Sequence, residues 1–439
     1  MESDQVDRER AERPCTLFPK VADGVCGQVN QTLLHAVRAR AGLAAGWAVA
    51  ALGFSLPIST TGDGVLLVAA VATWLVSGKA AELPGTIQKN RLVLLLPGLF
   101  LLFAVGAVHG LAPLDERFKY LWRYNDLLLP LIFVPIFSDP AVRQRALWGF
   151  GCGIAVTLVL SYLLAAGWNP LGPWFHGTAA NAIVFRHAIT QNVLMSMGAL
   201  LFATAGAQQS QAWKRYGLSF LAACAVIDVF FFVEGRTGQV ILALLIPIWF
   251  ARRVGVRGLL VGIGVVLALV AVSYAVSPVF HDRVGKTLAE IDQAQREEVA
   301  PITSSIGMRM EWYRNTLGLI ADSPVFGVGT GSFPRAYAEY VTNPLALKPP
   351  HPHNQYLLTA AELGVGGAIA LILCLGTLWR EFSFAVRSMY GELGQGAVIA
   401  MAIGCLFNSL FLDHTEGLFF AWIWSTSMAS LGDNGRHGS

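Results

Sequence analysis

Long apolar runs separated by polar segments make up most of the chain. A helix needs about 20 predominantly apolar residues to cross the hydrocarbon core of a bilayer, and runs close to this length recur between residues 42 and 431. The pattern therefore predicts about twelve membrane-spanning helices. We expect them near 42–58, 64–77, 92–109, 126–138, 146–167, 189–207, 216–233, 238–251, 258–276, 356–379, 394–411 and 415–431. The second, fourth and eighth are short for a full crossing, which is typical of tilted or broken helices.

The composition agrees with this interpretation. Hydrophobic residues make up 54% of the 439 residues and charged residues only 13%, about half of the roughly 25% found in soluble domains. Soluble enzymes, secreted disulfide scaffolds and nucleic-acid-binding domains are excluded as classes, so no nucleic-acid partner is expected. The expected fold class is an all-α polytopic membrane protein surrounded by membrane lipids.

The positions of Lys and Arg predict the orientation. With the N-terminus in the cytoplasm, the cytoplasmic loops carry more basic residues than the outer ones, as the positive-inside rule requires. These residues are Lys79, Lys89, Arg143, Arg145, Lys214, Arg215, Arg252, Arg253, Arg257, Arg380 and Arg387. The predicted organisation is a cytoplasmic tail (1–40), nine helices (41–276), an outer loop (277–355), three helices (356–431) and a cytoplasmic tail (432–439).

The outer loop is mixed in character. Residues 284–297 are a polar helix candidate, and residues 308–320 are amphipathic at helical spacing, which is typical of a helix lying in the membrane interface. The expected apolar face carries Trp312, Leu317 and Ile320. The glycine-rich stretch 326–333 (FGVGTGSF) predicts a turn.

Ionisable residues near the ends of the predicted helices are candidate functional residues, because charges at membrane depth are costly. By the predicted topology, a group of them shares the outer side. The group contains Arg186, His187, Glu234, Arg236, Gln239, Arg309, His353, Asn354, Asp413, His414 and Glu416. The six cysteines show no metal or redox spacing and are expected to be small packing residues.

Two arginines are candidates for binding an anion. Arg236 lies in the turn EGRTGQ between two apolar helices, and Arg309 precedes Trp312 and Tyr313. A planar guanidinium suits phosphate oxygens that are held in pairs. The alternative for each is a basic side chain that anchors a helix end at the interface.

His353 opens the tenth predicted helix and is a candidate general base. A neutral imidazole accepts a proton near ambient pH, and the positive end of the helix dipole favours the neutral ring. A capping or surface histidine is the alternative. His351 makes a metal pair conceivable, but no third ligand lies nearby, so no metal is expected. Asp413 either orients a base or caps the last helix.

These residues resemble the O-antigen ligase/polymerase superfamily. The turn EGRTGQ is similar to the family's S-R-T-G turn, with Gly235 where serine is frequent. The run 306–333 resembles the family's periplasmic stretch, an arginine before an aromatic residue and then a G-x-G turn. His353 and Asn354, followed by Gly364 and Gly367, fit the ligases' histidine pattern.

The resemblance implies an O-antigen ligase of the bacterial inner membrane with a GT-C-like helical fold. Such enzymes transfer a glycan from undecaprenyl pyrophosphate to a sugar hydroxyl of the lipid A-core on the periplasmic side, without metal or cofactor. The expected catalytic residues are His353, Arg236 and Arg309. The expected substrate-binding residues are Arg186, His187, Gln239, Asn354 and Asp413.

Three alternatives stay open at this point. The first is an O-antigen polymerase, or a ligase that glycosylates proteins, since these use the same donor. The second is a transporter of an anionic substrate, which predicts internal repeats that the sequence does not show. The third is a structural scaffold, which leaves the grouped arginines and histidine unexplained.

Overall fold

The computed structural model describes residues 19–170, 172, 177–276, 285, 305–342, 346–385 and 388–434. These residues are helical apart from connections and one isolated bridge between Thr178 and Asn181. The long helices, in chain order, are α1 (Pro19–Ser55), α2 (Thr60–Val76), α4 (Leu95–Val108), α7 (Pro140–Ala165), α8 (Ala188–Ala207), α9 (Ala212–Ile227), α10 (Arg236–Val254), α11 (Val256–Val276), α13 (Ser305–Asp322), α15 (Gln355–Phe384), α16 (Met389–Phe407) and α17 (His414–Asn434).

Shorter helices connect them. They are η1 (Lys79–Glu82), α3 (Leu83–Lys89), η2 (Arg91–Leu94), α5 (Leu114–Trp122), η3 (Asn125–Leu128), α6 (Pro130–Ile136), η5 (Asp228–Phe232, a π-helix), α14 (Phe333–Tyr340) and η6 (Leu410–Leu412).

Several helices begin where side-chain chemistry favours a start. Ser59, Asp139, Asn354 and Ser388 each accept a hydrogen bond from a backbone N–H in the first turn of the following helix. Such caps satisfy amide groups that have no partner inside the helix. The helix boundaries therefore follow from local chemistry as well as from hydrophobicity.

Eight helices among the described residues are long and apolar enough to cross a membrane. They are Arg91–Val108, Pro140–Ala165, Ala188–Ala207, Ala212–Phe232, Arg236–Val254, Val256–Val276, Gln355–Phe384 and Met389–Phe407. The count rises to nine if Thr60–Val76 and Lys79–Lys89, which are bent by 78° against each other, form one span. The chain is thus an all-helical, multi-pass membrane protein.

This count is lower than the twelve spans predicted from hydropathy. The other predicted spans coincide with α1, α6 and α17, which are helices but lie outside the set of eight. In α6 the helix is only seven residues long and contains Pro135, which cannot donate a helical hydrogen bond. Helix length and hydropathy in the described residues thus support eight or nine of the twelve predicted crossings.

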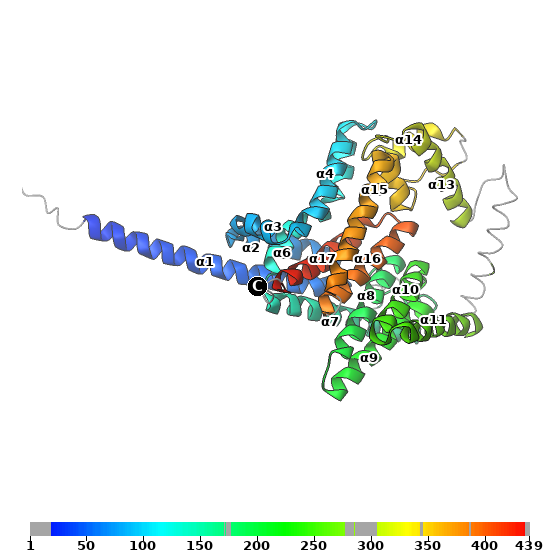
Figure 1. The fold of residues 1–439 in the computed structure, drawn as a ribbon, viewed down its shortest axis with the longest axis horizontal. Coiled ribbons are helices and arrows are strands. Elements are labelled where there is room, and N and C mark those ends of the chain that lie inside the picture. Colours follow the sequence, from blue (N-terminus) through cyan, green and yellow to red (C-terminus); the bar gives the residue numbers. More distant parts are fainter. Residues whose placement is uncertain are drawn as a thin grey trace, which may run out of the picture.

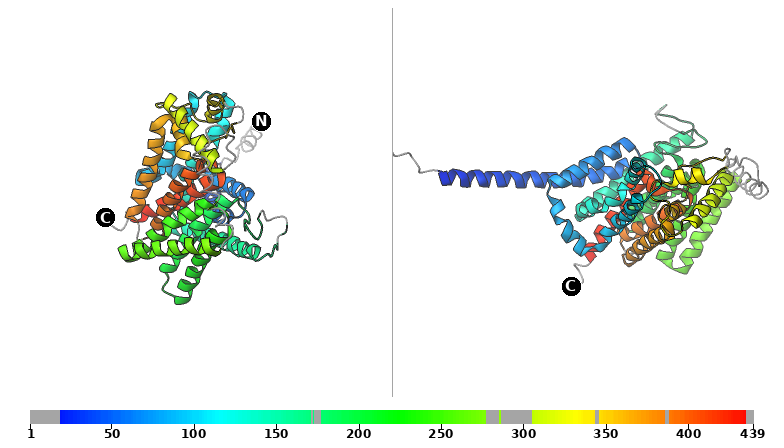
Figure 2. Two further views of the ribbon diagram at one scale, coloured as in Figure 1. Left: turned by 90° about the vertical axis from the view of Figure 1, so that its right-hand side faces the viewer. Right: turned by 90° about the horizontal axis from the view of Figure 1, so that it is seen from above.

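The structure adds detail to the N-terminal segment and differs from one expectation about the outer loop. The segment expected as a polar tail up to residue 40 is helical from Pro19 and continuous with the first apolar run; Figures 1 and 2 show α1 projecting from the rest of the molecule. In α13, Leu317 is exposed whereas Trp312 and Ile320 pack against the core, so the three do not share one lipid-facing side. The helix candidate 284–297 lies outside the described residues.

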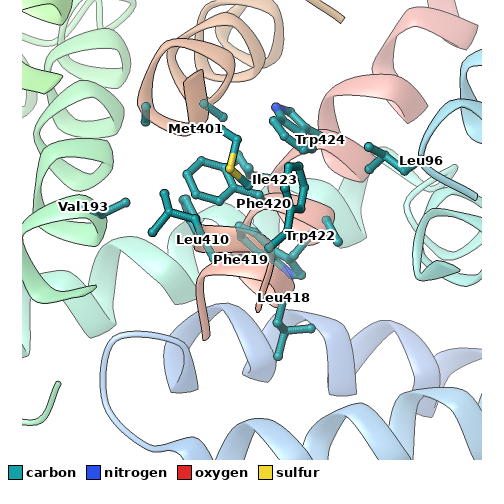
Figure 3. Close-up of a cluster of buried hydrophobic side chains, with 14 of the residues drawn as sticks. Leu96, Val193, Met401, Leu410, Leu418, Phe419, Phe420, Trp422, Ile423 and Trp424 are labelled. Carbon is teal, nitrogen blue, oxygen red and sulfur yellow. The ribbon is translucent and has the colours of Figure 1, made fainter. Parts of the chain in front are cut away.

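The centre of the bundle is built on α17. Phe419, Phe420, Trp422 and Trp424 are fully buried, and Figure 3 shows them packed together with residues of neighbouring helices. The indole of Trp422 donates to the carbonyl of Val49 in α1 (3.0 Å). The hydroxyls of Ser425 and Thr426 are also buried and donate to carbonyls of α17 itself, so the helix can lie in the interior.

Hydrogen bonds bring the described parts of several connections together at one end of the bundle. The amide of Glu234 donates to Asn181 in the connection before α8, and Tyr313 of α13 donates to the carbonyl of His353 before α15. Hydrogen bonds between them support this grouping, for example from Asn354 of α15 to the carbonyl of Leu406 in α16 (3.3 Å). We call this the site end, because it carries every candidate residue.

The predicted glycine-rich turn secures a break in α15. The helix opens at Gly364, whose φ is +74°. The freed carbonyls of Ala361 and Glu362 accept hydrogen bonds from the amides of Val328 (2.8 Å) and Gly329 (2.9 Å). The turn thus replaces backbone hydrogen bonds that the broken helix lacks, which is obligatory at membrane depth.

Replacing Gly329 by alanine tests this arrangement. Gly329 has a φ of +88°, and an added Cβ would overlap the backbone of Gly110. A left-handed conformation costs an L-residue about 1–2 kcal/mol, and the overlap adds to this cost. We expect Gly329→Ala to lower the thermal unfolding temperature of the purified protein clearly. Gly366→Ala, where an added Cβ meets nothing within 4 Å, is the control, and equal effects of both variants would contradict the assignment.

Candidate active site

The turn between α9 and α10 presents Arg236 at the surface of the site end. Asn192 of α8 holds this turn, because its Nδ2 donates to the carbonyls of Val233 (3.3 Å) and Gly235 (3.1 Å). A side chain at position 235 would collide with Asn192, which explains the glycine. The exposed guanidinium of Arg236 makes no hydrogen bond or ion pair within the described part of the chain. It is therefore available to an anion.

Buried polar side chains tie this turn to the connection that precedes α8. The Ser161 hydroxyl contacts the carboxylate of Asp228 (2.5 Å) and the carbonyl of Ala182 (3.0 Å). The amide of Glu234 donates to the side-chain oxygen of Asn181 (2.9 Å). Each contact joins two segments that are distant in sequence. The turn that carries Arg236 is therefore held by α7, by α8 and by the connection between them.

Arg186 is engaged inside the protein. Its guanidinium forms an ion pair with Asp63 (2.5 Å), donates to the carbonyl of Leu56 (2.6 and 2.9 Å), and donates to the hydroxyl of Thr415 (3.1 Å). The side chain is 4% exposed and that of Asp63 is fully buried. The structure therefore places this predicted substrate-binding residue in a network that joins α2 to the start of α17.

Gln239 is also used locally. Its amide nitrogen lies 3.4 Å from the carbonyl oxygen of Val229 and 3.5 Å from that of Phe230. Both carbonyls border the π-helical turn that precedes Arg236. Gln239 thus stabilises the turn through its contacts with η5. Its predicted contact with substrate stays a prediction.

His353 has the least common backbone conformation at the site end. Its φ of +54° is the one positive value of a non-glycine residue among the described positions. Such strained residues concentrate at functional sites. Its imidazole stacks on the indole of Trp312 (5.2 Å between centroids), and its carbonyl accepts from the hydroxyl of Tyr313 (3.3 Å). Both aromatic residues belong to α13, which therefore covers the histidine.

The electrostatic surroundings favour a neutral His353. Burial lowers the pKa of His353 below its usual value, and the positive charge of Arg309 lowers it further. Two of the three predicted catalytic residues are thus neighbours. At neutral pH the ring is uncharged and able to accept a proton.

Asn408 links His353 to Asp413. The Asn408 side chain lies beside the imidazole and raises the pKa of His353. Its Nδ2 donates to the carboxylate of Asp413 (2.9 Å). Burial raises the pKa of Asp413, whereas Arg123 and the Asn408 hydrogen bond oppose this rise. No sequence pattern points to Asn408, because its role depends on partners 55 residues upstream and five residues downstream.

A polar cavity of about 760 Å³ lies beside this group. Its wall includes His187, Asn408 and Asp413, together with Arg123, His414 and Glu416. The Arg123 guanidinium donates to the carbonyl of Leu412 (3.1 and 3.2 Å). Arg123 was not predicted as a site residue, and its place in a short basic connection at the site end is the signal that could have found it.

The turn that carries Arg236 contacts helices on two sides. Thr237, the next residue, lies near Gly404 of α16, about one turn before Asn408. Gly235 adjoins the backbone of Ala188 at the start of α8. The turn therefore lies near the end of α16 that leads to Asn408.

The residues around His351 do not form a metal centre among the described part of the chain. The rings of His351 and His353 are 4.4 Å apart. Burial lowers the pKa of His351 to about 4, and His353 and Arg123 add to the effect. No group of three or more His, Cys, Asp or Glu side chains is assembled there or elsewhere in the described segments.

Breaking the buried pair between Arg186 and Asp63 tests whether Arg186 is structural. Removing one partner of a buried pair costs about 3–5 kcal/mol, because it leaves an unpaired charge. We expect Arg186→Met alone to lower the thermal unfolding temperature strongly, and Arg186→Met with Asp63→Leu to recover most of the loss. A single variant as stable as the wild type would show that the pair does not hold these helices.

Comparison with known proteins adds an independent finding. The O-antigen ligase family matches residues 220–372, a segment that contains Arg236, Arg309 and His353. No curated protein matches the chain. The matched segment supports membership of the O-antigen ligase/polymerase superfamily, which the motifs predicted.

Proposed function

We propose that the protein is an O-antigen ligase. It transfers a glycan from undecaprenyl pyrophosphate to a sugar hydroxyl of the lipid A-core. The observation that carries the proposal is the arrangement of His353 between Arg309 and the Asn408–Asp413 pair, at the edge of a polar cavity. The family match supports the general class of glycan ligase or polymerase.

The chemistry follows from the charges at the site end. Arg236 and Arg309 bind the diphosphate of the donor and stabilise the negative charge that develops as it leaves. Fixed donors of this kind usually make the largest contribution to catalysis. A diphosphate is already a good leaving group, so no acid has to protonate it.

His353 removes the proton of the acceptor hydroxyl. The new bond forms between the acceptor oxygen and the anomeric carbon, the bond from that carbon to the diphosphate oxygen breaks, and the proton passes to the imidazole. A single displacement inverts the anomeric configuration. Asn408 holds one ring nitrogen as a donor, so that the other nitrogen faces the hydroxyl.

The remaining polar residues position these groups. His187, Asn354 and Asp413 border the acceptor side of the site, and Arg186 acts indirectly, through the connection that it fixes between α2, α8 and α17. We further propose a GT-C-like architecture in the bacterial inner membrane, with about twelve helices at membrane depth and the site end facing the periplasm. No cofactor is required by this scheme.

Reconstitution with defined acceptors tests the assignment. The purified protein in vesicles receives an undecaprenyl-pyrophosphate glycan and either lipid A-core, a second copy of the lipid-linked glycan, or a pilin-like peptide. We expect transfer to the lipid A-core. Transfer to the second carrier would identify a polymerase, transfer to peptide would identify a protein ligase, and no transfer to any acceptor would overturn the proposal.

Substitution of the three catalytic residues is expected to separate their roles. Arg236→Gln and Arg309→Gln should each lower the rate by at least about 10²-fold, as loss of an oxyanion donor does. His353→Ala should still bind donor but transfer slowly. Arg335→Gln is the matched control, because Arg335 is an exposed arginine of α14 that pairs with Glu339. Normal transfer by His353→Ala in a lipopolysaccharide gel assay would remove the base assignment.

The pH dependence tests the link through Asn408. A base is active when neutral, so activity should fall as the pH drops through the lowered pKa of His353. Asn408→Asp places a carboxylate on the imidazole, which favours the charged ring and raises its pKa. We therefore expect the acidic limb of the pH–rate profile to move to higher pH, with activity retained at alkaline pH. Asn408→Leu should lower the turnover without such a displacement, and an unmoved limb in Asn408→Asp would contradict the link.

A further inference from the structure

The short helix α5 carries an exposed apolar stripe that no part of the described chain covers. Leu114, Phe118 and Trp122 follow one another at intervals of four residues and are 56%, 58% and 70% exposed. Residues four positions apart lie only about 40° apart around a helix. The three side chains therefore form one continuous strip along the whole length of α5.

The other sides of α5 differ in character. Tyr120 and Leu121 are buried against the protein. Asp115 and Lys119 form an ion pair across one turn (3.7 Å) and are 70% and 80% exposed. The helix thus has a protein-facing side, an apolar exposed side and a charged exposed side. This division is typical of a helix at the boundary between acyl chains and water.

The stripe continues the lipid-facing surface of α4. Along that span the exposed residues Leu101, Val105 and Val108 follow at intervals of four and three residues, so they share one side of the helix, and they face the bilayer because the helix crosses it. Arg117 of α5 donates to the carbonyls of Ala107 (2.5 Å) and Val108 (2.9 Å). The end of the span is therefore fastened to α5, and the exposed apolar residues of the two helices lie on neighbouring elements.

The stripe ends at the polar cavity. Trp122 and the next residue, Arg123, both belong to the cavity wall. Arg123 also acts on the pKa of Asp413. A path of apolar side chains thus leads from the membrane face of α4 to the charged groups of the site.

We propose that α5 lies in the membrane interface with its stripe among the acyl chains, and that the cavity opens to the bilayer beside Trp122. The partner of this surface is the lipid bilayer itself. Resting on the proposed function, a second statement follows: a lipid-anchored substrate reaches the cavity along α5 while its chain stays in the membrane.

Spin labels at neighbouring positions test the first statement without any assay of activity. The protein, with its six native cysteines replaced, carries a label at Phe118→Cys or at Lys119→Cys and is reconstituted in phospholipid vesicles. We expect the Phe118 label to be relaxed mainly by oxygen, which concentrates in lipid, and the Lys119 label mainly by a water-soluble nickel chelate. Equal access of the nickel chelate to both labels would overturn the interfacial position of α5.

Kinetics with two donors test the second statement. One donor carries the long polyprenyl chain, and the other carries a short, water-soluble prenyl chain on the same glycan diphosphate. We expect Phe118→Glu to raise KM for the long-chain donor about tenfold and to leave kcat and the short-chain donor nearly unchanged. Leu317→Glu, at an equally exposed residue of α13, is the control and should alter neither donor.

The outcomes separate the two proposals. An equal loss with both donors would assign Phe118 a structural role and overturn the entry path. A wild-type protein that transfers glycan from neither donor would overturn the proposed function, while the label measurement would still decide the position of α5.

Discussion

The whole site end depends on one constraint: polar groups near membrane depth must find their partners inside the protein. The break in α15 illustrates it. Glu362 is buried, and its side-chain oxygen accepts the amide of Gly331 (2.9 Å), while its backbone carbonyl accepts the amide of Gly329. The turn can approach this closely only because glycines stand at the contacts. A non-helical backbone is thus stabilised within the bundle, and it holds the segment that leads to His353.

The same constraint divides the arginines into two groups. Arg186 is surrounded by acceptors, and its charge is balanced by Asp63. Arg236 is exposed at a helix start, and Arg309 acts on His353 through its charge. A guanidinium whose donors are occupied holds helices together, whereas one with free donors can receive an anion. Position in the fold, and not residue type, decides between these roles.

The helix positions and the side of the candidate residues could be predicted from the sequence, because both depend on local hydrophobicity and on alternation along the chain. The number of full crossings is not matched in the same way. The seven-residue helix α6 is too short to cross on its own, and the position of α17 follows from its packing in the interior. The glycine turn was recognised as a turn, but its partner in α15 lies about 30 residues away. Contacts between distant segments, such as Arg186 with Asp63, leave no pattern in a single sequence.

Arg123 and Asn408 show the same limit at the site. Each is an ordinary polar residue in a short connection, and each gains its importance only when η6 brings Leu412 and Asp413 beside it. His353, Arg309 and Arg236 were predicted as catalytic residues because they belong to recognisable motifs. The proposed reacting groups could therefore be suggested from the sequence, whereas the residues that position them required the fold.

The Asn408 amide lies between His353 and Asp413 and therefore affects the charge of the imidazole. A carboxylate in direct contact with an imidazole favours the protonated ring, and a bound diphosphate would favour it too. A protonated His353 could not accept the proton of an acceptor hydroxyl. Burial and Arg309 work in the opposite direction and lower the pKa of His353, while Asn408 keeps the carboxylate of Asp413 one residue away. In the proposed mechanism His353 can therefore stay neutral beside an anionic donor, and after it accepts the proton, Asn408 still lies between the imidazolium and the carboxylate of Asp413.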